Sequence, residues 1–102
     1  MTRVTVLRAG ETVTGFECKG HSGYAEAGRD IVCAAISALT TACVNALETV
    51  AGVVPAVEIG EARMKVSLDK GNRDAQIVFR TILQGLSDIA SEYPDHLTVI
   101  NR

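Results

Sequence analysis

The sequence lacks tryptophan and has only two phenylalanines, two tyrosines and two prolines among 102 residues. It also has no excess of basic residues, since ten Lys and Arg against twelve Asp and Glu give a formal charge of −2. Proteins that bind nucleic acid usually carry a basic stripe, so we expect no direct nucleic-acid partner. The weak negative charge is compatible with a basic polypeptide partner.

Long apolar runs are also missing. Ser37, Thr40, Thr41 and Asn45 interrupt the most apolar segment, which leaves no run of the roughly 18 residues that a membrane span needs. The first residues lack the apolar core of a signal peptide. We therefore expect a cytoplasmic protein that does not contact a membrane.

The three cysteines, at positions 18, 33 and 43, are odd in number and show no Cys-x-x-Cys spacing. This pattern argues against a disulfide framework. It also leaves a zinc site without enough ligands. We expect neither a metal nor any other cofactor.

The hydrophobic pattern predicts seven elements within one domain over residues 1–102. Alternating, β-branched segments indicate strands, and apolar residues three and four positions apart indicate helices. We expect strands at 2–8, 12–19, 54–59, 62–68 and 96–100, and helices at 31–50 and 73–92. This ββαββαβ order favours an α+β fold with two helices packed on a mostly antiparallel sheet. A domain of this size buries only about 60–65% of its unfolded surface, so dimerisation would stabilise it.

Cys33 lies near the start of the first predicted helix, three residues after the predicted N-cap Asp30. On a helical wheel at about 100° per residue it shares a narrow polar stripe with Ser37, Thr40 and Thr41, opposite an apolar arc. Free cysteine is usually a small buried hydrophobe. A thiol at a helix start, however, meets unpaired N–H groups and the positive end of the helix dipole, which stabilise a thiolate. Cys33 is therefore a candidate nucleophile, and the same N–H groups are candidate oxyanion donors.

His21 is a candidate base for this thiolate, because it lies in a glycine-rich loop over residues 20–29 that can fold back over the helix start. Gly20 and Gly23 flank it, and glycine permits positive φ and a close approach of backbone to a bound peptide. A lone histidine in a loop is more often only solvated. His96 begins the last predicted strand, shows no partner in the pattern and is expected at the surface.

The segment GHSGYAEAGRDIVCAAISAL, followed by TACVNALE, resembles the ribosomal-processing cysteine protease family of bacteria. The later segment GLSDIASEYPDHLTV and the ββαββαβ order extend the resemblance over essentially the whole chain. Its most specific part is G-H-x-G-Y-A followed by G-x-D-I-V-C-A-A-x-S-A-L. The resemblance implies a homodimeric endopeptidase, needed for ribosome maturation, that removes a short N-terminal extension from a large-subunit ribosomal protein. It also implies cleavage after an aromatic residue and before a small one.

The same resemblance implies roles for individual residues. By position in the pattern, Cys33 is the nucleophile and His21 the general base of a Cys-His dyad. Gly20 matches the hinge of a mobile loop, while Asp30 and Ser37 match recurrent polar positions beside the cysteine. These assignments are what the resemblance adds to the helix-start argument for the thiol.

Two other functions fit parts of the pattern. A non-catalytic ribosome-associated binding protein, with an inert cysteine, is compatible with a small acidic domain. A thiol-transfer protein fits less well, because no Cys-x-x-Cys motif or resolving cysteine is in obvious reach. Cys18 and Cys43 match no functional position and are interpreted as strand and core residues. A faster thiol reaction at Cys33 than at the other two cysteines would favour the enzyme.

Overall fold

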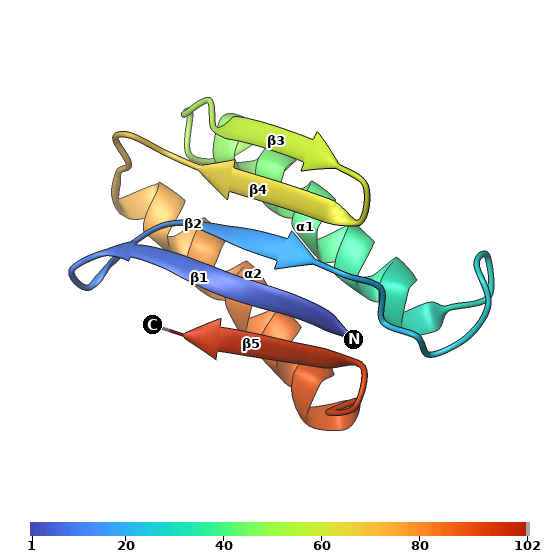
Figure 1. The fold of residues 1–102 in the computed structure, drawn as a ribbon. Coiled ribbons are helices and arrows are strands. Elements are labelled where there is room, and N and C mark those ends of the chain that lie inside the picture. Colours follow the sequence, from blue (N-terminus) through green and yellow to red (C-terminus); the bar gives the residue numbers. More distant parts are fainter. Residues whose placement is uncertain (102) are drawn as a thin grey trace.

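Seven elements follow one another in the computed structural model, which describes residues 1–101. They are β1 (Thr2–Ala9), β2 (Thr12–Lys19), α1 (Ile31–Thr49), β3 (Ala56–Gly60), β4 (Arg63–Ser67), α2 (Arg73–Glu92) and β5 (Leu97–Asn101). The strands form one sheet in the order β3-β4-β2-β1-β5, and both helices cover the same face of it (Figure 1). All neighbouring strands are antiparallel except β1 and β5, which are parallel. The predicted α+β fold with a mostly antiparallel sheet is confirmed.

The second hairpin differs slightly from the prediction. β3 begins at Ala56 rather than at residue 54, because Pro55 has no backbone N–H to donate to a strand ladder. Gly60 still pairs with Arg63, so the turn falls on Glu61 and Ala62, one residue later than expected. Ala62 adopts the positive φ of 50° that this turn requires.

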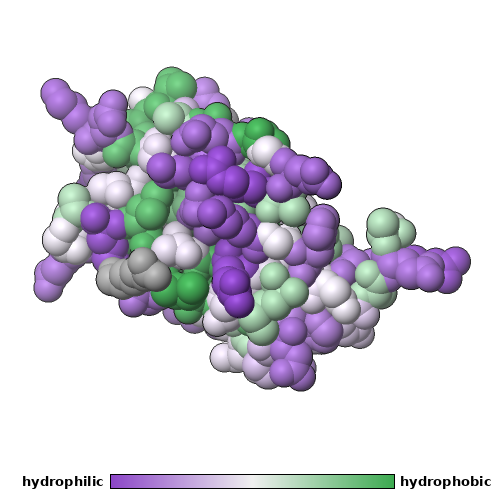
Figure 2. All heavy atoms as spheres, in the orientation of Figure 1, coloured by the Kyte–Doolittle hydropathy of each residue, from purple (hydrophilic) through white to green (hydrophobic). Residues whose placement is uncertain are grey.

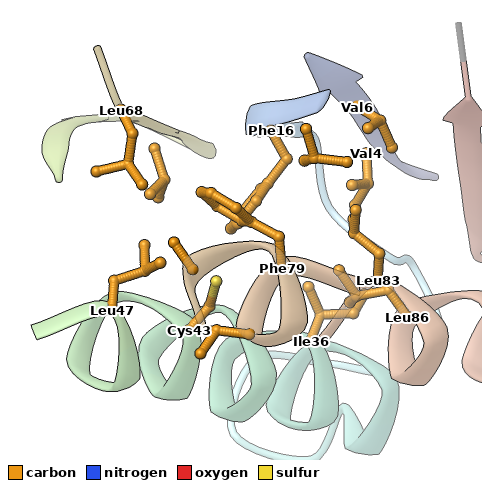
Figure 3. Close-up of a cluster of buried hydrophobic side chains, with 14 of the residues drawn as sticks. Val4, Val6, Phe16, Ile36, Cys43, Leu47, Leu68, Phe79, Leu83 and Leu86 are labelled. Atoms are coloured by element: carbon orange, nitrogen blue, oxygen red, sulfur yellow. The ribbon is translucent and has the colours of Figure 1, made fainter. Parts of the chain in front are cut away.

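The core lies between the sheet and the two helices, with Phe16 of β2 and Phe79 of α2 at its centre (Figure 3). α2 buries the apolar face that the sequence predicts, which includes Val78, Phe79 and Leu86. The opposite face of the sheet carries no helix and is largely hydrophilic (Figure 2). On that face Glu17 forms an ion pair with Arg63 at 2.8 Å.

α1 packs through a different face from the one predicted. Its buried residues are Val32, Ile36, Thr40, Cys43 and Leu47. Thr40, predicted on the polar stripe, is 5% exposed, and its hydroxyl donates to the carbonyl of Ser37 at 3.2 Å. The core-facing side is therefore rotated towards Cys33, whose exposed thiol lies at the border of the buried face.

α1 is also more apolar than its interruptions suggested. By length and composition alone it would pass for a membrane span, because an 18-residue window has a mean hydropathy of 1.7. The polar residues that interrupt the apolar run do not lower the mean hydropathy below this criterion. A core helix of a folded domain meets the same criterion, and α1 contributes five side chains to the core of this one.

Candidate active site

The carboxylate of Asp30 joins the loop before α1 to the first turn of the helix. One of its oxygens, Oδ1, accepts from the backbone N–H of Cys33 at 2.8 Å, which confirms Asp30 as the N-cap. The other, Oδ2, accepts from the hydroxyl of Ser22 and from the N–H groups of Tyr24 at 3.2 Å and Ala25 at 3.4 Å. The hydrogen bond from Ser22, with those from the backbone, lowers the pKa of Asp30 to about 2. Asp30 is consequently ionised at neutral pH and binds loop and helix together.

Two cavities meet at Cys33. The first, of about 570 Å³, lies under the 20–30 loop and is lined by His21, Gly23, Asp30, Cys33 and Ser37 among others. The second, of about 370 Å³, runs from the same cysteine towards β3 and β4. His21, Cys33 and Ser37 line both cavities, and Gly20 lines the second. The structure therefore brings all six candidate site residues to one continuous surface.

Gly20 connects β2 to the loop that carries His21. It has a φ of 95°, and its N–H donates to the carbonyl of Ala62 at 2.8 Å. A Cβ at this position would lie 2.5 Å from the carbonyl oxygen of Met1. Gly23 has a φ of 68°, so both glycines adopt the positive φ that this residue type permits. Glycine at position 20 is required by the backbone conformation and also by the lack of space.

His96 is not the solvated surface residue that the sequence predicted. Its ring is half-buried, and Nδ1 lies 2.9 Å from the carbonyl oxygen of Ser22. Its centroid lies 5.4 Å from that of the Tyr24 ring, at an interplanar angle of 78°. The prediction was wrong because 74 residues separate Ser22 from His96, and only the fold brings them together.

The N–H groups at the start of α1 are not all available to a substrate. The N–H of Cys33 donates to the side chain of Asp30, and that of Ala34 donates to the Asp30 carbonyl at 3.0 Å. Within residues 1–101 no protein acceptor is found for the N–H groups of Ile31 and Val32. Ile31 is exposed and lines the first cavity, whereas Val32 is 1% exposed, so the donor open to a substrate is the N–H of Ile31.

The three cysteines lie in different surroundings. Cys33 is the only one of the three that is exposed. Burial raises the pKa of the Cys43 thiol to about 12. Burial, together with the nearby Cys33 sulfur, also raises the pKa of Cys18, which lines the second cavity. The interpretation of Cys18 and Cys43 as strand and core residues is confirmed, since Cys18 lies in β2 and Cys43 is buried in α1.

Direct contact between the two central side chains is not made in this conformation. Among the side-chain hydrogen bonds of residues 1–101, none joins His21 to Cys33. Catalytic hydrogen bonds are often long until substrate is bound, so a shared cavity is the relevant observation. No cluster of three or more His, Cys, Asp or Glu residues suited to a metal occurs in the described part of the chain. An exposed thiol and an imidazole that line the same two cavities are the chemistry that the site offers.

Comparison with known proteins gives consistent matches. The family model described as cysteine protease Prp matches residues 1–98. The ribosomal processing cysteine protease Prp of Bacillus subtilis (strain 168) is 33% identical over an alignment of 107 positions, which covers 97% of this chain and 96% of that protein. The structure of the essential ribosomal processing protease Prp from S. aureus, with a covalently linked product peptide, matches with a TM-score of 0.92 at 28% identity over 100% of both chains. A second structure of that protease, with a substrate peptide, gives a TM-score of 0.86 at 27% identity, again over 100% of both chains.

Proposed function

Because this chain belongs to the Prp family of cysteine proteases, we propose that it removes a short N-terminal extension from a large-subunit ribosomal protein during ribosome maturation. The observation that carries the proposal is the position of Cys33. It is the exposed thiol of the three, it lies at a capped helix start, and it lines the same two cavities as His21. The relative from B. subtilis is named as a ribosomal processing protease, which supports the substrate class.

In the proposed mechanism Cys33 and His21 act as a dyad. His21 accepts the thiol proton, and the Cys33 sulfur attacks the carbonyl carbon of the scissile peptide bond. The N–H of Ile31, a residue that lines the first cavity, has no protein acceptor within residues 1–101 and is available to the oxyanion of the tetrahedral intermediate. The C–N bond then breaks as the His21 imidazolium protonates the leaving amine. Water hydrolyses the thioester, releases the extension as a carboxylic acid and restores the thiol.

The preference for an aromatic residue before the cleaved bond fits the second cavity. Its lining includes the apolar side chains of Ile36, Ile59 and Met64 as well as Cys33. A volume of about 370 Å³ is large enough for an aromatic side chain. The first cavity, on the loop side, is left for the small residue after the bond and the chain that follows it.

The supporting residues have distinct proposed roles. Asp30 holds the loop and caps the helix, as its four hydrogen bonds indicate. Ser37 is exposed one turn beyond Cys33 and lines both cavities, so its hydroxyl is placed to hydrogen-bond the peptide. Gly20 and Gly23 give the His21 loop its path.

We further propose that the protein is a cytoplasmic homodimer, since ribosomal proteins are assembled in that compartment and the chain is small. The outer face of α1 supports self-association. Ala38 and Ala42, which line neither cavity at the site, are exposed there, although a helix that is apolar on all sides is normally buried. A second copy of the chain would cover this face.

Cleavage of a peptide that spans the extended N-terminus of the host ribosomal protein tests the function. Cys33→Ala should lower kcat/KM by more than about 10³-fold, and His21→Ala by about 10²- to 10⁴-fold. Cys43→Ala is the matched control, because it removes a thiol of the same helix that lines neither cavity at the site. Circular dichroism should show an unchanged fold. Cleavage by Cys33→Ala at the wild-type rate would contradict the proposal, and binding without cleavage by the wild type would favour the non-catalytic alternative.

A further inference from the structure

The loop that carries His21 is fixed at two separate places. One is the Asp30 carboxylate on the side of α1, described above. The other is on the opposite side, where the ring of Tyr24 meets Tyr93, at the end of α2, and His96, just before β5. No feature of the Cys-His mechanism explains this second contact.

The geometry of the second contact is specific. The centroids of Tyr24 and Tyr93 lie 5.5 Å apart with an interplanar angle of 85°, and those of Tyr24 and His96 lie 5.4 Å apart at 78°. Both are edge-to-face arrangements, which aromatic rings favour over a face-to-face sandwich. Because Tyr24 is 42% exposed, general burial does not fix its ring. The two neighbouring rings are what hold it.

His96 also holds the backbone of the loop. Its Nδ1 lies 2.9 Å from the carbonyl oxygen of Ser22, whose own side chain is 2% exposed and donates to Asp30. The residues that flank the Ser22–Tyr24 segment are exposed, and His21 is one of them. The position of the His21 imidazole is thus determined mainly by how its neighbours are fixed.

We propose that Tyr24, Tyr93 and His96 form an aromatic clasp that positions His21 for its reaction with Cys33. Tyr24 is then a positioning residue, because it acts through the loop and not on the substrate. Three glycines with positive φ, at 20, 23 and 28, would otherwise allow the loop many conformations. A misplacement of about 1 Å is enough to slow a reaction by about 10²-fold. The inference rests on the proposed function, since it assumes that His21 activates Cys33.

The clasp is tested with variants that remove the ring or only its hydroxyl. Tyr24→Ala should lower kcat at least tenfold while KM changes less than twofold, and Tyr24→Phe should restore most of kcat. Tyr93→Ala, which leaves the contact of Tyr24 with His96, should lower kcat less than Tyr24→Ala does, and the double variant should be no slower than Tyr24→Ala, because that variant already removes both ring contacts. Ile77→Ala, an exposed residue of α2 outside the clasp, is the control.

A second readout does not need a substrate. The rate at which iodoacetamide alkylates Cys33 at pH 7 reports how far His21 activates the thiol. Tyr24→Ala should lower this rate to that of His21→Ala, whereas Tyr24→Phe should keep the wild-type rate. Thermal unfolding followed by circular dichroism confirms that each variant is folded.

The possible outcomes distinguish a failure of the clasp proposal from a failure of the proposed function. Wild-type kcat and alkylation in Tyr24→Ala would overturn the clasp while leaving the protease intact. A loss confined to KM would overturn it too, because it would make Tyr24 a substrate contact, and an equal loss in Tyr24→Phe would assign the effect to the hydroxyl. If the wild type cleaves no ribosomal peptide but Tyr24→Ala and His21→Ala slow alkylation equally, the proposed function fails and the clasp stands.

Discussion

Gly20 is the residue at which the end of β2 becomes the loop that carries His21. Its backbone adopts a φ of 95° directly beside the carbonyl of Met1, and its N–H bonds to the β3–β4 turn. The position of His21 therefore depends on contacts among the end of β2, the start of β1 and the turn between β3 and β4. A side chain at position 20 would disturb all of them.

Gly20→Ala tests this dependence. The new Cβ would lie 2.5 Å from the Met1 carbonyl oxygen, so either the loop or β1 must shift. We expect a destabilisation of about 1–3 kcal/mol from the strained φ alone, and a loss of kcat that exceeds what unfolding explains. Gly10→Ala is the matched control, because Gly10 also has a positive φ, of 64°, but open space around its Cβ position. Urea denaturation and peptide cleavage measure both effects, and equal behaviour of the two variants would contradict the account.

The site residues that could be predicted are those fixed by short spacings. Asp30 as N-cap, Cys33 in the first turn and positive φ at Gly20 and Gly23 all follow from local rules of helix capping and glycine conformation. His96 could not be predicted, because its contacts come from residues more than 70 positions away. A local sequence pattern contains no information on such a contact.

At the scale of elements, the first turn of α1 is the part on which the proposed chemistry depends. Asp30 caps the helix and also accepts three hydrogen bonds from the loop, so helix and loop share one carboxylate. The helix dipole favours a negative charge at this end. Loop order and helix stability are consequently coupled through the ionisation of a single group.

This coupling predicts a pH dependence of stability. The pKa of folded Asp30 is lowered to about 2 from an ordinary value of 3.8, first by the hydrogen bond from Ser22. Its contribution is thus fully present above about pH 4 and is lost as pH falls towards 2. Asp30→Asn keeps a capping side chain but removes the charge.

We therefore expect Asp30→Asn to be less stable than the wild type at pH 7, with a difference that shrinks between pH 4 and pH 2. Urea denaturation at pH 7, 5, 4 and 3 measures the difference. Asp74→Asn, in the first turn of α2, serves as the control. A difference that stays constant over this pH range would show that the charge of Asp30 does not stabilise the fold.

The two helices differ in how well their buried faces could be predicted. α2 has apolar residues on one side and polar ones on the other, so the spacing of its apolar residues was enough to predict which face is buried. α1 has alanine or another apolar residue on nearly every side, and the wheel then misplaced its core face and put Thr40 on the wrong side. Only packing against the sheet and α2 resolves which face is buried.

At the scale of the whole molecule, the sheet brings distant segments to one end. β5 pairs in parallel with β1, which places the C-terminal part of α2 and His96 beside the loop that follows β2. The backbone N–H of Thr2 bonds to the carbonyl of His96 at 3.0 Å. The end of the molecule that holds the candidate site is therefore built from the first, middle and last parts of the chain.

The exposed outer face of α1 predicts self-association. Sedimentation analysis should give twice the chain mass of 10.8 kDa. Ala42→Glu, which places a charge on this face away from the first turn, should shift the protein towards the monomer. Ile77→Glu on the exposed side of α2 is the control. A wild type that is monomeric at all concentrations, or a dimer unaffected by Ala42→Glu, would contradict this arrangement.

The most direct test of the central claim, that Cys33 is the nucleophile of a protease, is the mass of the enzyme during turnover. Acid quenching of the reaction with the extended ribosomal peptide should trap a thioester. We predict an added mass equal to the N-terminal extension less one water, located by peptide mapping on Cys33. Cleavage that proceeds without any adduct, or an adduct on Cys18 or Cys43 in place of Cys33, would contradict the account.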